Sequence, residues 1–480
     1  MADTGSILAD LEKKSTEAAE KPKTSVMSSV NIASISSVSG NPIGRLMRTS
    51  KDGLQFSEFD STQKSIDLPS GGKTPSVLSE MSKEERRFEI LSYCTTLGIL
   101  FMQGWNDGTT GPLLPTMQSH YKIGYTVVSL IFVSNCIGFV SAAIANIRMV
   151  QKLGFGTTLA IGAAMQAIGY CIQGPAPPFP VFVVAYFFSG FGLSLQAAGS
   201  LTFVVNLKHS SNKMGLLLAL YGVGALVSPL VATRFSTMPD WSYHYFVSFG
   251  GTVINLIAIC LVFRFRRMEV ILDKAGQVVH DGASSPGGGL YKQIFGLKVV
   301  HLLAFFTLAY VGTEVSIGGW IVTFIIQERN GGTSSGYISS GFFAGLTIGR
   351  LVLLPVNKII GERRVVFIYI SVCIGLELTI WFVSSLVGNA LAVAFIGFLF
   401  GPIYSIITNT AGRVIPHWLA NGAIGWIGSF GQMGSALLPF ITGVISSKYG
   451  VTSLQPLIVA SMGMMLLLWI VVPPEVHPSA

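Results

Sequence analysis

The chain has 480 residues, of which half are hydrophobic and only 11% are charged, and its formal net charge is +8. A water-soluble protein of this length needs a densely charged surface, so this composition excludes a soluble domain and favours a membrane protein. The positive charge does not indicate nucleic-acid binding, because the basic residues flank apolar runs instead of forming one basic domain.

The segment before the first apolar run, residues 1–87, is rich in serine and threonine and has few aromatic residues. Such a segment buries too little apolar surface to offset its ordering entropy, so we expect a disordered tail on the cytoplasmic side. Its serines are candidate phosphorylation sites, and a solvated leader without that role is the plainer interpretation. No basic region followed by a short apolar core opens this segment, so the first transmembrane helix is expected to direct targeting.

Twelve apolar runs of about 20 residues follow, and this is the length that an α-helix needs to cross a bilayer. Their ranges are 88–116, 124–146, 156–174, 180–207, 213–235, 243–265, 298–327, 335–356, 363–386, 389–414, 422–446 and 452–472. A polar segment, 267–297, contains the flexible sequence SSPGGG and separates six runs from six. We therefore predict an all-α membrane protein with twelve transmembrane helices in two six-helix bundles, 88–266 and 298–473, and a short tail at 474–480.

Lysine and arginine concentrate at one end of the predicted helices. The residues at this end are Arg86, Arg87, Arg148, Lys152, Lys208, Lys213, Arg264, Arg266, Arg267, Lys274, Lys292, Lys298, Lys358, Arg363 and Arg364. The opposite loops hold chiefly Lys122, Arg329 and Lys448. Because cytoplasmic loops carry an excess of positive charge, both termini are predicted to be cytoplasmic.

Three carboxylates, Asp107, Glu314 and Glu377, lie deep inside the apolar runs. A charged side chain near the centre of a bilayer costs roughly 2.5–3.5 kcal/mol, so such residues usually face the interior of a helix bundle and mark a proton, ion or substrate path. Their presence indicates a membrane transporter.

Asp107 shares one helix face with Gln103, because the two residues are four positions apart. Pro112 and Pro115 follow, which predicts a kinked or locally unwound end to the first helix. Glu314 has small and polar neighbours, which indicates a helix that faces solvent-filled space. We interpret both acids as candidate proton-coupling residues, and the alternative for Asp107 is a structural hydrogen-bond hub.

Amide and tryptophan side chains in the predicted helices are candidates for substrate contact. Amides offer donors and acceptors to hydroxylated or zwitterionic solutes, and indole rings stack on a sugar or an aromatic amine. The candidate substrate-binding residues are Gln103, Trp105, Asn106, Gln196, Trp320, Asn409 and Gln432. The alternative roles are interhelical hydrogen bonding for the amides and packing for the tryptophans.

No catalytic motif accompanies these residues. The chain has no GxxxxGK phosphate cradle, no metal-ligand spacing among its five cysteines and no recognisable Ser/His/Asp set. We therefore expect neither an enzyme nor a bound cofactor or metal. Transport would draw on a solute or ion gradient, and the proton is favoured because the buried charge candidates are carboxylates.

Four glycine-rich segments resemble helices four, seven, eight and ten of the fucose and galactose proton symporters of the major facilitator superfamily. They are 190–199 (GFGLSLQAAG), 310–320 (YVGTEVSIGGW), 341–350 (GFFAGLTIGR) and 401–406 (GPIYSI). The cytoplasmic loop motif of the superfamily appears loosely as NKIIGERR at 357–364 and more weakly after the second run. The resemblance implies the major facilitator fold over residues 88–472.

The resemblance also implies a site. In that family an aspartate of the first helix and a glutamate of the fourth form the protonatable, substrate-contacting pair. Asp107 matches the first position, whereas Gln196 stands at the second and carries no proton. Coupling is therefore expected to rest on Asp107 alone or together with Glu314, while Glu377 belongs to a peripheral helix and is expected to make an interhelical hydrogen bond.

The sequence therefore predicts a secondary transporter that moves a small polar, sugar-like solute or metabolite by alternating access, with protons as the coupling ion. A proton-driven exporter of a secondary metabolite is the main alternative, and a membrane sensor that does not transport is a further one. The expected partners are a small-molecule substrate, protons and the lipid bilayer, without nucleic acid, and we expect a monomer in the plasma membrane.

Overall fold

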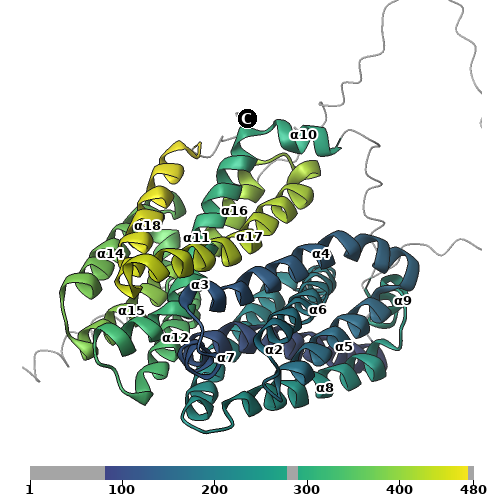
Figure 1. Ribbon diagram of the computed structural model, residues 1–480. Coiled ribbons are helices and arrows are strands. Elements are labelled where there is room, and N and C mark those ends of the chain that lie inside the picture. The colour runs from purple at the N-terminus through teal and green to yellow at the C-terminus, as the bar shows by residue number, and fades with distance from the viewer. Residues whose placement is uncertain (1–81, 278–289, 474–480) are drawn as a thin grey trace, which may run out of the picture. The chain divides into compact units, whose positions relative to one another are not determined.

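The computed structural model describes residues 82–277 and 290–473, and these residues are almost entirely helical (Figure 1). The first set of helices is α2 (Lys83–Tyr121), α3 (Tyr125–Val128), α4 (Leu130–Leu153), α5 (Phe155–Gln173), α6 (Phe179–Val205), α7 (Ser210–Ser236), η1 (Trp241–Tyr243), α8 (His244–Phe263) and α9 (Met268–Lys274). The second set is α10 (Leu290–Gly296), α11 (Lys298–Glu328), η2 (Thr333–Gly336), α12 (Tyr337–Val352), α13 (Leu354–Ile360), α14 (Glu362–Phe382), α15 (Leu386–Phe400), α16 (Ile403–Val414), α17 (His417–Tyr449), η3 (Val451–Ser453) and α18 (Leu454–Val471). Residues 1–81 of the tail expected at 1–87, the tail 474–480 and residues 278–289 of the linker lie outside the described residues, whereas residues 83–87 of the expected tail belong to α2.

Each of the twelve predicted membrane runs coincides with a long helix or with short helices that follow one another. Within the described residues, nine helical segments are long and apolar enough to cross a membrane, and the pair α12 and α13, bent by 55°, makes a tenth. Pro355 lies at the start of α13 and cannot donate a backbone hydrogen bond, which accounts for the bend. The two remaining long helices, α2 and α17, are less apolar, and both line the cavity described below.

Helix α2 begins at a capping box, in which Ser82 and Glu85 satisfy each other's backbone N–H groups. It runs without interruption through Pro112 and Pro115 to Tyr121. Of the predicted kinked or locally unwound end, the unwound alternative is therefore wrong. The residues around Pro112 are buried by neighbouring helices, and this packing holds the backbone helical although each proline removes one hydrogen bond.

The backbones of α2 and α7 are in direct contact through glycines. A Cβ atom at Gly104 would lie 1.8 Å from the carbonyl oxygen of Tyr221, and one at Gly224 would lie 2.0 Å from that of Phe101. Such close approach requires residues without a side chain and is common between membrane helices. It places Tyr221 of α7 beside the middle of α2.

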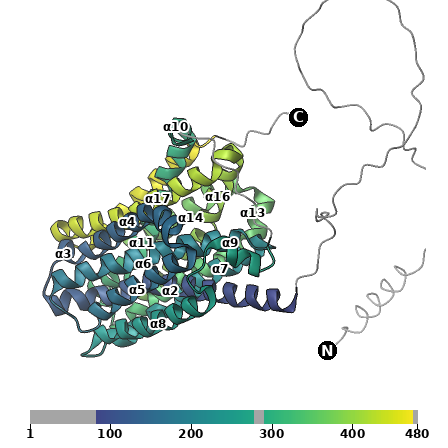
Figure 2. The ribbon, with the colours of Figure 1, turned by 90° about the vertical axis from the view of Figure 1, so that its right-hand side faces the viewer.

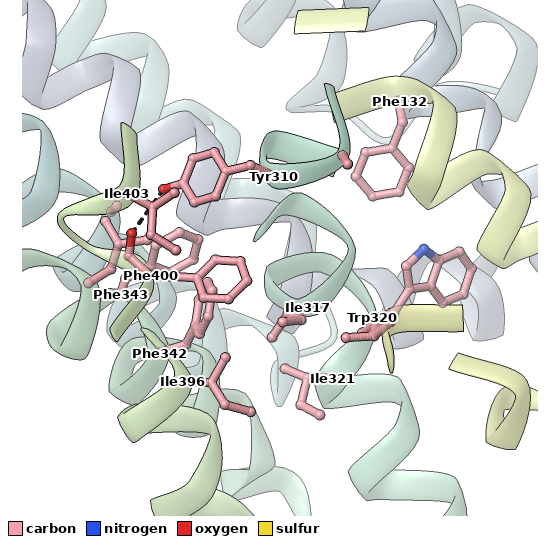
Figure 3. Close-up of a cluster of buried hydrophobic side chains, with 14 of the residues drawn as sticks. Phe132, Tyr310, Ile317, Trp320, Ile321, Phe342, Phe343, Ile396, Phe400 and Ile403 are labelled. Carbon is pink, nitrogen blue, oxygen red and sulfur yellow. Dashed lines mark hydrogen bonds between the residues drawn. The ribbon is translucent and has the colours of Figure 1, made fainter. Parts of the chain in front are cut away.

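In the second set, α11 packs against α12 and α15 through large apolar side chains. Figure 3 shows Ile317 and Ile321 pointing toward Phe342, Ile396 and Phe400. The hydroxyl of Tyr310 donates to the carbonyl oxygen of Phe400 at 3.3 Å, which ties α11 to the end of α15. These contacts fix the face of α11 that carries Glu314.

The two sets of helices meet near the C-terminal ends of α2 and α11. A Cβ atom at Gly111 of α2 would lie 2.2 Å from the carbonyl oxygen of Gly318 of α11. Nearby, Thr126 of α3 bonds Ser447 of α17 through its backbone N–H at 3.0 Å and its hydroxyl at 2.7 Å. Figures 1 and 2 both show α17 beside α3 and α4. This junction lies at the end opposite the positively charged ends that the sequence predicts to be cytoplasmic.

Candidate functional site

A cavity of about 460 Å³ lies between the two sets of helices. Its lining comes from α2, α4, α6 and α7 of the first set and from α11, α12, α16 and α17 of the second. Among the described residues, α5, α8, α14 and α18 contribute none of the lining. The helices thus divide into a central group that borders the cavity and a peripheral group that supports it.

Asp107 of α2 opens into the cavity and accepts hydrogen bonds on both carboxylate oxygens. The hydroxyl of Tyr221 donates to Oδ2 at 2.8 Å, and the amide Nδ2 of Asn106 donates to Oδ1 at 3.2 Å. Donors of this kind stabilise an ionised carboxylate.

Behind Asn106, a row of buried polar side chains leads away from the cavity. The hydroxyl of Tyr170 donates to Oδ1 of Asn106 at 3.1 Å, and Nε2 of Gln166 donates to the Tyr170 oxygen at 3.1 Å. Nε2 of Gln196 in turn donates to Oε1 of Gln166 at 2.7 Å. Gln196 of α6 is therefore linked to Asp107 of α2 through α5.

The second set contributes one acidic and one basic side chain to the cavity. Glu314 of α11 lines it, as does Tyr310 one helical turn before it. Arg350 of α12 interacts electrostatically with Glu314, and its Cζ atom lies 5.5 Å from the ring centroid of Tyr221, a cation–π distance. Arg350 thereby connects the acid of the second set to the tyrosine that bonds the acid of the first.

Two carboxylates and one guanidinium leave the described lining one positive charge short when all three are ionised. An uncompensated charge in a region of low dielectric constant is expensive, so the second carboxylate favours a bound cation. Within the described residues, no group of three or more histidine, cysteine, aspartate or glutamate side chains is placed to hold a metal ion.

The structure places five of the predicted site residues in the lining of the cavity: Gln103, Asn106, Asp107, Glu314 and Gln432. They come from α2, α11 and α17, so the cavity gathers them from both sets.

The two predicted tryptophans lie outside this lining. Nε1 of Trp105 donates to Ser248 at 2.8 Å, and its ring stacks on His244 at 5.4 Å, so it faces α8. Nε1 of Trp320 donates to the carbonyl oxygen of Pro439 at 3.1 Å. Both rings are buried and their single donors are already used, so neither stacks on a solute in this conformation.

Two predicted amides and Glu377 also lie outside the lining of the cavity. Gln196 is 1% exposed and bonds Gln166, while Nδ2 of Asn409 donates to Glu362 at 3.0 Å at the start of α14. Glu377 is buried on the peripheral helix α14, and its Oε1 has no hydrogen-bond partner among the described residues.

Sequence reasoning missed Arg350, Tyr221 and Tyr310. Arg350 carried a signal, because it is the only lysine or arginine inside the apolar run 335–356. The tyrosines carried none, since the sequence does not show what a tyrosine in an apolar run contacts.

Residues 96–439 match the sequence profile of the Major Facilitator Superfamily. The chain belongs to this family. It is therefore a multi-pass membrane protein of a transporter family, and the resemblance expected from the glycine-rich segments is confirmed.

Curated relatives extend over most of the chain. It is 24% identical over 392 residues to Bypass of stop codon protein 6 of Saccharomyces cerevisiae, covering 75% of this chain and 77% of that protein. It is 23% identical over 354 residues to the glucose/mannose transporter GlcP of Bacillus subtilis, covering 72% and 84%. A glucose/galactose transporter of Brucella abortus is 20% identical over 383 residues, covering 74% and 88%.

Solved structures share the fold at low sequence identity. A D-xylose-proton symporter superposes with a TM-score of 0.66 at 12% identity, covering 81% of this chain and 98% of that chain. The transporter FucP in its outward conformation gives 0.56 at 15% identity, covering 81% and 100%. The nucleoside transporter NupG gives 0.63 at 13% identity, covering 80% and 98%.

Proposed function

We propose that this chain is a proton-coupled secondary transporter that moves a small polar organic solute across the plasma membrane by alternating access. Residues 88–266 and 298–473 would be the two bundles that rock about the cavity. In the conformation described here, the bundles touch near Gly111 and Gly318, so the cavity would open toward the predicted cytoplasmic end.

The observation that carries this proposal is the meeting of Asp107, Glu314 and Arg350 around one cavity. Asp107 comes from the first bundle, and the other two come from the second. A proton that binds between two bundles changes the charge balance at their interface, and this is what coupling to a rocking motion requires. By contrast, the ion pair of Lys213 and Glu89 lies within the first bundle.

Hexoses are the first solutes to test. The names of two relatives state transport of glucose together with mannose or galactose. The amides of Gln103 and Gln432 line the cavity and offer donors and acceptors for hydroxyl groups. Asn106 is bonded on both sides, so we assign it to Asp107 and not to the solute.

The test is uptake of radiolabelled hexoses by proteoliposomes with an imposed pH gradient. We expect accumulation that collapses when the gradient is dissipated and that is lost in Asp107→Asn, which keeps the shape of the side chain but removes its titratable group. Accumulation at the parent rate in this variant would contradict the proposal. Reversing the gradient in the same vesicles distinguishes uptake from export.

A further inference from the structure

We propose that Gln196, Gln166 and Tyr170 are positioning residues that confine the transported proton to Oδ2 of Asp107. The inference rests on the proposed function and deepens it, because it assigns the proton to one atom of the coupling residue. It also gives Gln196 a role that a carboxylate at the same place would not fill.

Every donor in the buried row points toward Asp107. Gln196 donates to Gln166 at 2.7 Å, Gln166 donates to Tyr170 at 3.1 Å, Tyr170 donates to Asn106 at 3.1 Å, and Asn106 donates to Oδ1 of Asp107 at 3.2 Å. The row crosses from α6 through α5 to α2. The four hydrogen bonds thus form a chain in which every donor lies on the Gln196 side of its acceptor.

The backbone of α6 sets this direction. The Nε2 group of Gln196 also donates to the carbonyl oxygen of Gly192 at 3.2 Å. If the Gln196 amide turned over, its oxygen would face two acceptors, the Gly192 carbonyl and Oε1 of Gln166. The amide is therefore held in one orientation, although its Oε1 has no partner among the described residues.

Burial keeps the other side chains of this hydrogen-bonded row in fixed orientations as well. Gln196, Gln166 and Tyr170 are each no more than 2% exposed, and Asn106 is 8% exposed, so water does not readily replace a lost bond. A buried polar group without a partner is costly, which keeps each donor on its acceptor. Because Oδ1 of Asn106 accepts from Tyr170, its Nδ2 must face Asp107.

A proton on Oδ1 of Asp107 would face this Nδ2 group, and two donors would then oppose each other. Oδ2 faces the hydroxyl of Tyr221, which can donate or accept. When the proton binds Oδ2, the bond to Tyr221 reverses: Oδ2–H donates to the tyrosine oxygen, and the tyrosine hydrogen turns into the cavity. No other bond changes, and the proton remains on Asp107.

The remaining titratable or charged groups near Asp107 lie on the cavity side or behind α2. Glu314 of α11 and Arg350 of α12 act from the second set, and Tyr186 of α6 lines the cavity. His244 of α8 faces the opposite side of α2, where it bonds Thr109 at 3.0 Å. Only the chain from Gln196 reaches Oδ1 within the described residues.

The test is pH-difference infrared spectroscopy of the full-length protein in lipid vesicles. The carboxylic-acid band of Asp107 is the band that Asp107→Asn removes, and its amplitude gives a midpoint pH. We expect Tyr170→Phe to shift this midpoint to higher pH by about 0.5 or more. Without the Tyr170 hydroxyl, the Asn106 amide is no longer held with its Nδ2 group on Asp107, so the ionised carboxylate loses a fixed donor. We expect Gln196→Met to shift it in the same direction.

The matched control is Tyr245→Phe. Tyr245 is equally buried, and its hydroxyl is bonded to Tyr186 at 3.0 Å, outside the chain. The control should leave the midpoint unchanged. The double variant Tyr170→Phe with Gln196→Met should shift the midpoint no further than Tyr170→Phe alone, because either change breaks the same chain.

An unchanged midpoint in Tyr170→Phe, an equal shift in the control, additive shifts in the double variant, or no band sensitive to Asp107→Asn between about pH 4 and 9 would each overturn the inference. Failure of the proposed function is a separate result, because it is accumulation by Asp107→Asn vesicles at the parent rate.

Discussion

The hydroxyl of Tyr221 donates to Oδ2 of Asp107 at 2.8 Å and joins helix α7 to the carboxylate of α2. The same tyrosine ring lies under the guanidinium of Arg350, which belongs to the second set of helices. One side chain thus contacts both the candidate coupling acid and the opposite bundle. A change in the charge of Asp107 would therefore directly alter the hydrogen bond made by Tyr221.

Tyr221→Phe is predicted to lower proton-driven accumulation about tenfold. The change removes a hydrogen bond to a charged group, worth about 1.5–3 kcal/mol, and keeps the ring beneath Arg350. Uptake into proteoliposomes as a function of external pH measures the effect. Tyr93→Phe is the control, because that hydroxyl donates to the backbone of Lys213 and lies outside the cavity lining. Equal losses in both variants would contradict a specific role for Tyr221.

Arg350→Gln is predicted to lower accumulation at least about tenfold and to lower the melting temperature. Without the guanidinium, Asp107 and Glu314 share the cavity with no compensating cation in the described lining. Arg350→Lys keeps the charge but loses the planar group that stacks on Tyr221, so it should retain part of the activity. Parent-level accumulation by Arg350→Gln in the same assay would show that the cation is dispensable.

Glu314→Gln and Glu377→Gln form a matched pair of changes to intramembrane acids. Glu314 lines the cavity and should alter the pH dependence of uptake or the apparent solute affinity when its charge is removed. Glu377 is buried on a peripheral helix and should change thermal stability and expression instead. The two variants are compared at matched amounts of inserted protein. An equal loss of flux in both would return the two acids to a structural role.

The sequence predicted the helices well because twelve long apolar runs have few other structures available in a bilayer. It predicted that Asp107 and Glu314 face the interior of the bundle, because a carboxylate inside an apolar helix must be compensated. Which face of each helix borders the cavity was harder to predict. Residues 193, 194, 197, 198 and 201 of α6 line it at helical spacing, and Gln196 lies off that face.

Three consecutive residues of α2 show why neighbours in sequence do not share a role. Successive residues of an α-helix are turned by about 100°, so they face different neighbours. Trp105 faces α8, Asn106 faces Tyr170 of α5, and Asp107 faces the cavity. The sequence gives the angle between them but not the identity of the surrounding helices, which is set by tertiary packing.

Trp105→Phe tests the corrected position of this tryptophan. Phenylalanine keeps a ring against His244 but removes the donor to Ser248, which should cost about 1 kcal/mol of stability. We expect a lower melting temperature and an unchanged apparent affinity for the transported solute. A large loss of affinity with an unchanged melting temperature would return Trp105 to the solute site.

Gly111→Ala tests whether the junction between α2 and α11 closes one end of the cavity. A Cβ atom at this position would lie 2.2 Å from the carbonyl oxygen of Gly318, and backbone atoms cannot give way as a flexible side chain does. The variant should therefore disfavour the conformation described here and populate one in which these ends are apart. Spin labels at the exposed positions Lys122 and Lys448, after replacement of the native cysteines, report this separation by pulsed electron resonance.

Gly124→Ala is the control for this measurement, because a Cβ atom there meets nothing within 4 Å. Its distance distribution should match that of the parent protein, whereas Gly111→Ala should gain a longer component. Proton-driven uptake should fall in Gly111→Ala alone, since a transporter that cannot close one end no longer alternates. If both variants keep the parent distribution and the parent flux, the contact of Gly111 with Gly318 does not form the gate.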